Sequence, residues 1–233
     1  MNTKRPTSFI SVLTIGVGGL MGVALLSSWL HTIPAAAKSA ATKTAKLPAT
    51  TMKAPQGKEI ATFAAGCFWS MEAIFEKLKG VESVEPGYSG GHVARPSYER
   101  VSQGKTGHAE AVNIIFDPKV ISYRDLLQVL LIVRDPTTLN RQGPDEGLNY
   151  RSVIFTHSAA QEKAAREAIR DITASKVWKA PIVTPVTSFA NFYRAEDYHR
   201  DYYTRNPQLA YCTGVIAPKL EELKKKFPDK VKP

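Results

Sequence analysis

Cysteine is scarce in this sequence, which has only Cys67 and Cys212 among its 233 residues. Two cysteines cannot form the set of several disulfides that holds many small secreted domains together, so that class of protein is excluded. Two possibilities remain: a single structural disulfide, or chemistry at one or both thiols. The composition alone does not choose between them.

Acidic residues are absent from the first 58 positions, where seven lysines and arginines account for +7 of the formal net charge of +10. The other +3 belongs to residues 59–233, which end in a basic stretch around Lys224–Lys226. The positive charge is therefore a property of the tails. A nucleic-acid-binding domain instead gathers its basic residues on one face or along one helix. We expect no nucleic-acid partner.

Charged residues are also missing from Phe9 to Leu30, a run of 22 mostly apolar positions after Lys4 and Arg5. A basic start, an apolar run and the small residues Ala35-Ala36-Ala37 predict a signal peptide over residues 1–37. The run also approaches the roughly 20 residues that span a bilayer, so an uncleaved anchor that tethers the protein to a membrane stays open. In both cases we expect an exported protein, periplasmic or extracellular.

Residues 38–58 are rich in Ala, Lys, Thr and Pro and predict a flexible basic linker, which leaves residues 59–233 as one domain. Apolar periodicity predicts the elements of this domain. We expect strands at 58–65, 81–91, 108–117, 150–157 and 180–189, helices at 67–80, 122–133 and 158–175, and loops at 90–107 and 134–149. This order predicts an α+β two-layer sandwich with a mixed or antiparallel sheet of the split β-α-β (ferredoxin-like) type, plus a C-terminal extension. Nothing in it requires more than a monomer.

Cys67 lies in the stretch "AAGCFWS", where the first predicted strand gives way to a helix. Unpaired N–H groups and the helix dipole at such a position can lower the pKa of a thiol from ~8.5 to between ~3.5 and ~7.5. Gly66 permits a sharp turn there. Phe68 and Trp69 are adjacent and cannot both enter the core, so at least one should line the space above Cys67. An inert core cysteine remains the alternative.

Glu110 is the second candidate site residue. In the strand predicted at 108–117 its side chain points to the same face as those of Val112 and Ile114. A carboxyl group on a buried face is costly unless it is paired, protonated or used in chemistry. A strand-end glutamate that reaches solvent is the alternative. The loops add polar groups that, with a thiol and an inward acid, would suit proton delivery to a leaving oxygen: Tyr98, Asp145 and Tyr150.

Seven motifs follow one another over residues 59–226: "GCFW" (66–69), "GYSGG" (87–91), "SYERV" (97–101), "TGHAE" (106–110), "DPTTLNRQGPDEGLNYRS" (135–152), "AEDYHRDYY" (195–203) and "NPQLAYCTGVIAPKL" (206–220). In these motifs the sequence resembles the A-type peptide methionine sulfoxide reductases. The resemblance implies an oxidoreductase that reduces methionine S-sulfoxide, free or in proteins, and so repairs oxidative damage.

The resemblance also implies roles for individual residues. Cys67 matches the nucleophile, which becomes a sulfenic acid as methionine is released. Phe68 and Trp69 match the residues that hold the substrate's methyl group, and Glu110 matches the acid that assists the departing oxygen. Three further residues match groups of the same site: Tyr98, Tyr150 and Asp145.

Recycling of the sulfenic acid is implied to use Cys212, which matches the resolving cysteine of one subgroup and would form a disulfide with Cys67. A thioredoxin-like protein would then reduce that disulfide, with no metal or organic cofactor. Ser70 stands where relatives have glycine or cysteine, so that position offers no resolving thiol. Arg134 stands where histidine often precedes Asp-Pro, and Asn149 replaces a common glutamine.

Two other functions remain to be weighed against the reductase. Cys67 could act as a hydrolase nucleophile with His108 or His199 as its base, which would require a histidine beside the thiol. Cys67 and Cys212 could instead form a permanent structural disulfide in a secreted, non-enzymatic module.

Overall fold

The computed structural model describes residues 53–233 of the chain. The predictions for residues 1–37, and most of the linker predicted at 38–58, lie outside the described residues. Within the described part of the chain, no helix is long and apolar enough to cross a membrane.

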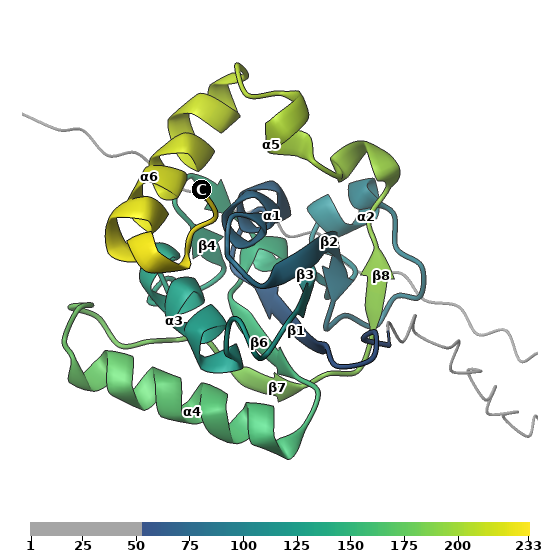
Figure 1. The fold of residues 1–233 in the computed structure, drawn as a ribbon. Helices are drawn as coiled ribbons and strands as arrows, with labels where there is room; N and C mark the ends of the chain where they lie inside the picture. Colours follow the sequence, from purple (N-terminus) through teal and green to yellow (C-terminus); the bar gives the residue numbers. More distant parts are fainter. Residues whose placement is uncertain (1–52) are drawn as a thin grey trace, which may run out of the picture. The chain divides into compact units, whose positions relative to one another are not determined.

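A six-stranded sheet forms the centre of the domain, with its strands in the order β7-β6-β1-β3-β2-β8 (Figure 1). Neighbouring strands are antiparallel, except that β7 runs parallel to β6. The predicted α+β class with a mixed, mostly antiparallel sheet is therefore confirmed, while its ferredoxin-like detail stays a prediction. The strands are β1 (Glu59–Ala64), β2 (Val81–Ser89), β3 (Ala109–Phe116), β6 (Val153–Thr156), β7 (Val186–Ser188) and β8 (Phe192–Arg194).

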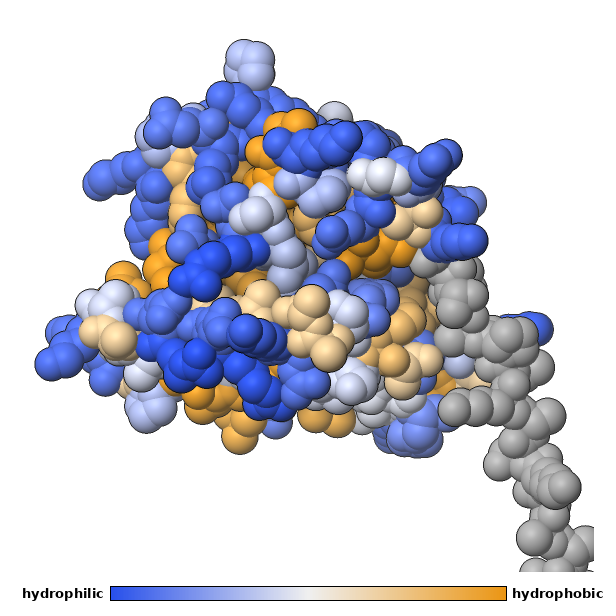
Figure 2. Space-filling model, turned by 60° about the horizontal axis from the view of Figure 1, so that its bottom comes forward, coloured by the Kyte–Doolittle hydropathy of each residue, from blue (hydrophilic) through white to orange (hydrophobic). Residues whose placement is uncertain are grey.

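Helices α1 (Phe68–Glu76), α3 (Tyr123–Val133), α4 (Ala159–Ala174) and α6 (Ala217–Lys226) surround the sheet, with α4 beside α3 and α6 against both α1 and α3 (Figure 1). The predicted capping box is present at the start of α3, where Ser122 and Asp125 exchange hydrogen bonds. Ser158 caps α4 in the expected way by accepting the Gln161 N–H. Figure 2, which brings the α4 side forward, shows hydrophilic side chains over much of this face.

The main core lies between β1–β3 and the helices. On β3 it contains the expected alternating residues Val112, Ile114 and Phe116, all fully buried. Glu110 points to the same face of β3 as these three residues. It lies at the end of the row that reaches the start of α1, where it accepts the Phe68 N–H. A smaller cluster on the opposite face of the sheet includes Phe155 and Phe192.

Several boundaries differ from the prediction. Helix α1 ends at Glu76 rather than near Gly80, because Leu78 bridges to Val231 and Gly80 has a φ of 80° in the turn before β2. The loop predicted at 90–107 contains the short helix α2 (Tyr98–Ser102). The loop predicted at 134–149 contains the hairpin β4 (Arg141–Gln142) and β5 (Asp145–Glu146), followed by η1 (Leu148–Tyr150).

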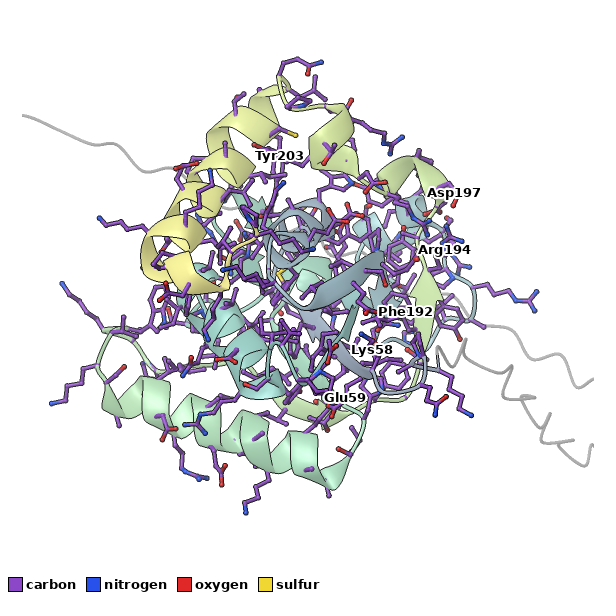
Figure 3. The ribbon with its side chains drawn as sticks, viewed as in Figure 1. Lys58, Glu59, Phe192, Arg194, Asp197 and Tyr203 are labelled. Atoms are coloured by element: carbon purple, nitrogen blue, oxygen red, sulfur yellow. The ribbon has the colours of Figure 1, made fainter. Side chains whose placement is uncertain are left out.

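The edge strand predicted at 180–189 is confirmed at one edge of the sheet, but only its last part forms β7. The opposite edge strand, β8, was not predicted. It is followed by η2 (Asp197–His199), and Arg194 of β8 reaches Asp197 with an N–O distance of 2.8 Å (Figure 3). The chain continues through α5 (Tyr202–Arg205) and a π-helical turn, η3 (Cys212–Ile216), which runs directly into α6.

Candidate active site

Cys67 is the N-cap residue of α1, as the sequence predicts, and its side chain is only 5% exposed. It follows Gly66, whose φ of 84° is strained for any residue with a Cβ. A Cβ at Gly66 would also lie 2.4 Å from Nη2 of Arg134. The Cys67 carbonyl accepts the backbone N–H groups of Ser70 and Met71, at 3.2 and 3.3 Å. The turn therefore fixes Cys67 at the N-terminus of the helix.

Glu110 occupies the position next to the thiol. Its Oε2 accepts the backbone N–H of Phe68 at 3.0 Å, and its side chain interacts electrostatically with the Cys67 thiol. The carboxyl group is 1% exposed, so the alternative of a glutamate reaching solvent is wrong. Burial raises its pKa to about 8, with the negative charge of Asp145 adding to the shift. Glu110 is thus largely protonated at neutral pH and can donate a proton.

The predicted low pKa of the Cys67 thiol is wrong for the resting site. Burial raises the pKa of this thiol well above its ordinary value, and the charge of Glu110 raises it further. Interactions with the Tyr211 side chain and the Trp69 backbone lower the pKa but do not outweigh burial. The resting Cys67 side chain is therefore a thiol rather than a thiolate.

An aromatic wall stands beside the thiol. Phe68 is buried, whereas Trp69 is partly exposed. The Trp69 indole stacks on Tyr202 with ring centroids 3.6 Å apart, and its Nε1 donates to Nδ1 of His199 at 3.0 Å. Phe68 packs against His199 and Tyr98. Both residues predicted to line the site are thus fixed by ring contacts.

Asp145 joins the site through Tyr211. The Tyr211 hydroxyl donates to Oδ2 of Asp145 at 2.6 Å and also lies within hydrogen-bonding reach of the Cys67 sulfur. Burial raises the pKa of Asp145, although the hydrogen bond from Tyr211 and the charge of Arg134 oppose the shift. This phenol–carboxylate pair can therefore exchange a proton with the thiol.

Tyr98 and Tyr150 complete the group of predicted site residues. Each senses the charges of Glu110 and Cys67. Burial raises the pKa of Tyr98 to about 12 and raises that of Tyr150 as well, so both phenols keep their protons. The structure thus places both phenols close enough to Cys67 and Glu110 to interact electrostatically with them.

Cys212 has no exposed surface, and it begins the π-helical turn η3. Burial raises the pKa of its thiol. Both cysteines are free, so the structural-disulfide alternative does not describe this structure. The two cysteines belong to the same core cluster.

Neither histidine of the hydrolase alternative pairs with the thiol. His108 accepts the Gly91 N–H at 3.0 Å and bonds the Val93 carbonyl with its other ring nitrogen, so it holds the preceding turn. His199 receives the Trp69 indole N–H. Its Nε2 is buried without a hydrogen-bond partner, and within the described residues no hydrogen bond joins either imidazole to Cys67, as a thiol–imidazole pair would require.

One group of carboxylates in the described residues could hold a metal ion: oxygen atoms of Glu72, Glu76 and Asp201 lie within 4.8 Å of one another. Glu72 accepts the Asp201 N–H at 3.0 Å, at a residue with a left-handed φ of 53°. Burial raises the pKa of Glu72 to about 8, so this carboxyl is mostly protonated. The hydrogen bond from the Asp201 N–H to Glu72 is the contact expected of a side chain that caps the turn at Asp201.

The sequence reasoning missed Tyr211, Tyr202 and the role of His199 as the partner of Trp69. All three lie in quoted motifs, and Tyr211 directly precedes Cys212. Placement beside a candidate cysteine was the signal available for Tyr211. The contacts of the other two depend on how the C-terminal extension folds back over α1.

Comparison with known proteins decides the family. The sequence model of the peptide methionine sulfoxide reductases matches residues 59–231. The chain belongs to this family. It is 49% identical over 175 residues to the peptide methionine sulfoxide reductase MsrA of Polynucleobacter asymbioticus, covering 75% of this chain and 92% of that protein. It is 51% identical over 174 residues to the MsrA of Saccharolobus solfataricus, covering 75% and 97% respectively.

Solved structures of MsrA enzymes share the fold. Reduced Mxr1 from Saccharomyces cerevisiae superposes with a TM-score of 0.65 at 35% identity, covering 71% of this chain and 96% of that one. Methionine sulfoxide reductase A of Corynebacterium diphtheriae gives a TM-score of 0.62 at 31% identity, covering 69% and 80%. This member of the family is thus an enzyme, an oxidoreductase that reduces methionine sulfoxide.

Proposed function

We propose that this reductase acts on the S epimer of methionine sulfoxide, free or in proteins, with Cys67 as its nucleophile. The observation that carries the proposal is the protonated Glu110 that touches the thiol at the mouth of α1. A sulfoxide sulfur bears an oxygen, a methyl group and the rest of the side chain. Because the acid and the aromatic wall hold two of these substituents while the thiol attacks from a third direction, only one epimer fits. The family resemblance indicates that it is the S epimer.

Substrate recognition in this proposal uses opposite sides of the site. Phe68 and Trp69 offer an apolar surface to the methyl group, and burying a methyl group stabilises the complex by about 0.8 kcal/mol. Glu110, Tyr98 and Tyr150 donate hydrogen bonds to the oxygen. An aromatic wall with a few convergent polar groups is the usual design of a small-molecule site.

In the first step the Cys67 sulfur attacks the sulfoxide sulfur. The thiol proton passes to the Asp145–Tyr211 pair, while Glu110 protonates the sulfoxide oxygen. The oxygen then moves to Cys67. Overall, the S–H and S=O bonds are replaced by the S–O and O–H bonds of a sulfenic acid, and methionine leaves. The substrate sulfur gains two electrons, which the Cys67 sulfur loses.

In the second step the Cys212 thiol attacks the sulfenic sulfur of Cys67. A disulfide forms and the oxygen leaves as water. An external dithiol then reduces the disulfide and is itself oxidised. A thioredoxin-like protein fits this role because it exchanges thiols for a disulfide without a metal or organic cofactor.

Single-turnover reduction with both sulfoxide epimers tests this proposal. Reduced enzyme without added dithiol should convert about one equivalent of the S epimer and little of the R epimer. Peptide mapping should then find a Cys67–Cys212 disulfide. Equal conversion of both epimers, or conversion without loss of the Cys67 thiol, would refute it.

We propose further that residues 1–37 direct export of the reductase, with an uncleaved membrane anchor as the alternative. The basic start, the apolar run and the small residues that follow support this. Cell fractionation and N-terminal sequencing of the mature protein test it. An unprocessed chain in the cytoplasm would contradict both forms.

A further inference from the structure

Arg134 is an arginine buried directly behind the nucleophile. Its side chain is 2% exposed, and it follows the last residue of α3. Its Nε donates to the Ala65 carbonyl at 2.8 Å, and its Nη1 donates to the Ser70 hydroxyl at 2.8 Å. The third nitrogen, Nη2, is buried and has no hydrogen-bond partner. Both partners are neutral, which is unusual for a buried guanidinium group.

The two residues to which Arg134 donates hydrogen bonds flank Cys67 in the sequence. Ala65 precedes the turn, and Ser70 lies in the first turn of α1. Nη2 faces Gly66, where an added Cβ would lie 2.4 Å away. The planar guanidinium group of Arg134 therefore holds the junction between β1 and α1 in place. Position 66 must be glycine because a Cβ there would collide with this group.

Charge gives this clamp a second role. The groups facing the Cys67 sulfur come from several elements: Glu110 from β3, Asp145 from β5, Tyr98 from α2, Tyr150 from η1 and Tyr211 ahead of η3. All of these are neutral or negative. Arg134 is the cation that interacts with Cys67, Tyr211 and Asp145, and an arginine keeps its charge even when burial lowers its pKa.

We propose that Arg134 is a positioning residue for the reaction, with Ser70 as its partner. It fixes the turn that carries Cys67 and supplies the positive charge that stabilises the anionic sulfur as the thiol loses its proton. The inference rests on the proposed role of Cys67 as the nucleophile. It also accounts for two departures from the family pattern together, because the Ser70 hydroxyl satisfies a nitrogen that histidine at position 134 would not have.

Alkylation of Cys67 by iodoacetamide as a function of pH tests the charge, because it reports the thiolate without requiring turnover. The experiment uses full-length protein with Cys212→Ala, so that a single thiol reacts, and mass spectrometry follows the modification. Arg134→Met should move the alkylation midpoint upward by at least one pH unit, a tenfold loss of reactivity at fixed pH. Arg134→Lys, which keeps the charge, should recover most of that shift.

The matched control is Arg124→Met on the same helix. Arg124 forms an exposed ion pair with Asp171, so its replacement removes a positive charge away from the site and should leave the midpoint unchanged. Ser70→Ala keeps the arginine but removes one anchor. We expect it to lower kcat severalfold with little change in KM, because the turn is less well held.

Equal midpoints for wild type, Arg134→Lys and Arg134→Met would overturn the proposal and leave Arg134 a purely structural residue. If Arg134→Met does not fold, Arg134→His decides, because histidine is mostly neutral above pH ~7. Its midpoint should match the upward shift expected for Met, and a wild-type midpoint would refute the role of charge. Turnover that survives Cys67→Ser would instead refute the proposed function and leave the alkylation result standing.

Discussion

The two cysteines of this enzyme occupy opposite chemical surroundings. Cys67 lies at the first turn of a helix among an acid, a carboxylate and three phenols. Cys212 lies in a π-helical turn, and burial alone shifts its pKa. Proton donors and acceptors are thus concentrated around the first thiol. In the proposed mechanism, this difference means that the attacking thiol needs proton donors and acceptors around it, whereas the resolving thiol needs only to reach the sulfenic acid.

The largest effect should come from Cys67→Ser, because a hydroxyl is far less nucleophilic than a thiol. We expect turnover of methionine sulfoxide with dithiothreitol to fall at least ~1000-fold. Chromatographic measurement of the methionine formed checks it. Cys212→Ala is the control, since small dithiols can reduce a sulfenic acid at Cys67 directly. Comparable activity of the two variants with dithiothreitol would contradict the proposal that Cys67 attacks the substrate and Cys212 only resolves the sulfenic acid.

With a thioredoxin-type donor the roles reverse, and Cys212→Ala should stop after about one turnover. A trapped sulfenic acid at Cys67 should then react with dimedone, which adds a defined mass. The Cys67→Ser protein should show no such adduct. Sustained turnover of Cys212→Ala with the protein donor would mean that resolution does not need Cys212.

Glu110→Gln should reduce kcat by about 10²–10⁴-fold, the usual contribution of a general acid. The pKa of Glu110 is about 8, so the acid form is present below this pH and is lost as the pH rises through it. Wild-type kcat should therefore decline above pH about 8, and the amide variant should lack this decline.

A matched control for Glu110 is Glu72→Gln, because burial also raises the pKa of Glu72 to about 8 while its carboxyl binds the Asp201 backbone. This variant should keep the alkaline decline. If it lost the decline as well, the titrating group would not be Glu110.

The smallest effect should come from Trp69→Phe, which removes the hydrogen bond to His199 but keeps an aromatic surface. We expect KM to rise about 5- to 10-fold with kcat little changed, in line with ~1 kcal/mol for a buried hydrogen bond. Trp178→Phe loses a similar bond, from Nε1 to the Leu131 carbonyl at 2.8 Å, and should leave KM unchanged. Equal changes in both would indicate a general loss of stability.

Local pattern was enough to predict much of this fold. Strand parity placed Glu110 on the core face with Val112, and the capping box placed the start of α3 at Ser122. Helix spacing placed Cys67 at the start of α1. These features depend on residues within one or two turns of one another, which is the range over which periodicity and capping carry information.

The failures depend on contacts between distant segments. Helix α1 stops early because the C-terminal Val231 pairs with Leu78, a contact that no local pattern reveals. The predicted thiolate at Cys67 was wrong because burial in the main core outweighs the effect of the helix terminus. Tyr211 reaches Asp145 across 66 positions of sequence.

The short edge strands of the sheet affect how readily this enzyme could pair with other polypeptide chains. An exposed strand edge is a template on which unfolded chains can assemble and aggregate. Here both edges, β7 and β8, offer only three residues of backbone each, and Pro185, which has no N–H to donate, directly precedes β7. A reductase of methionine sulfoxide in peptides thereby presents few backbone groups at either sheet edge with which a substrate chain could pair.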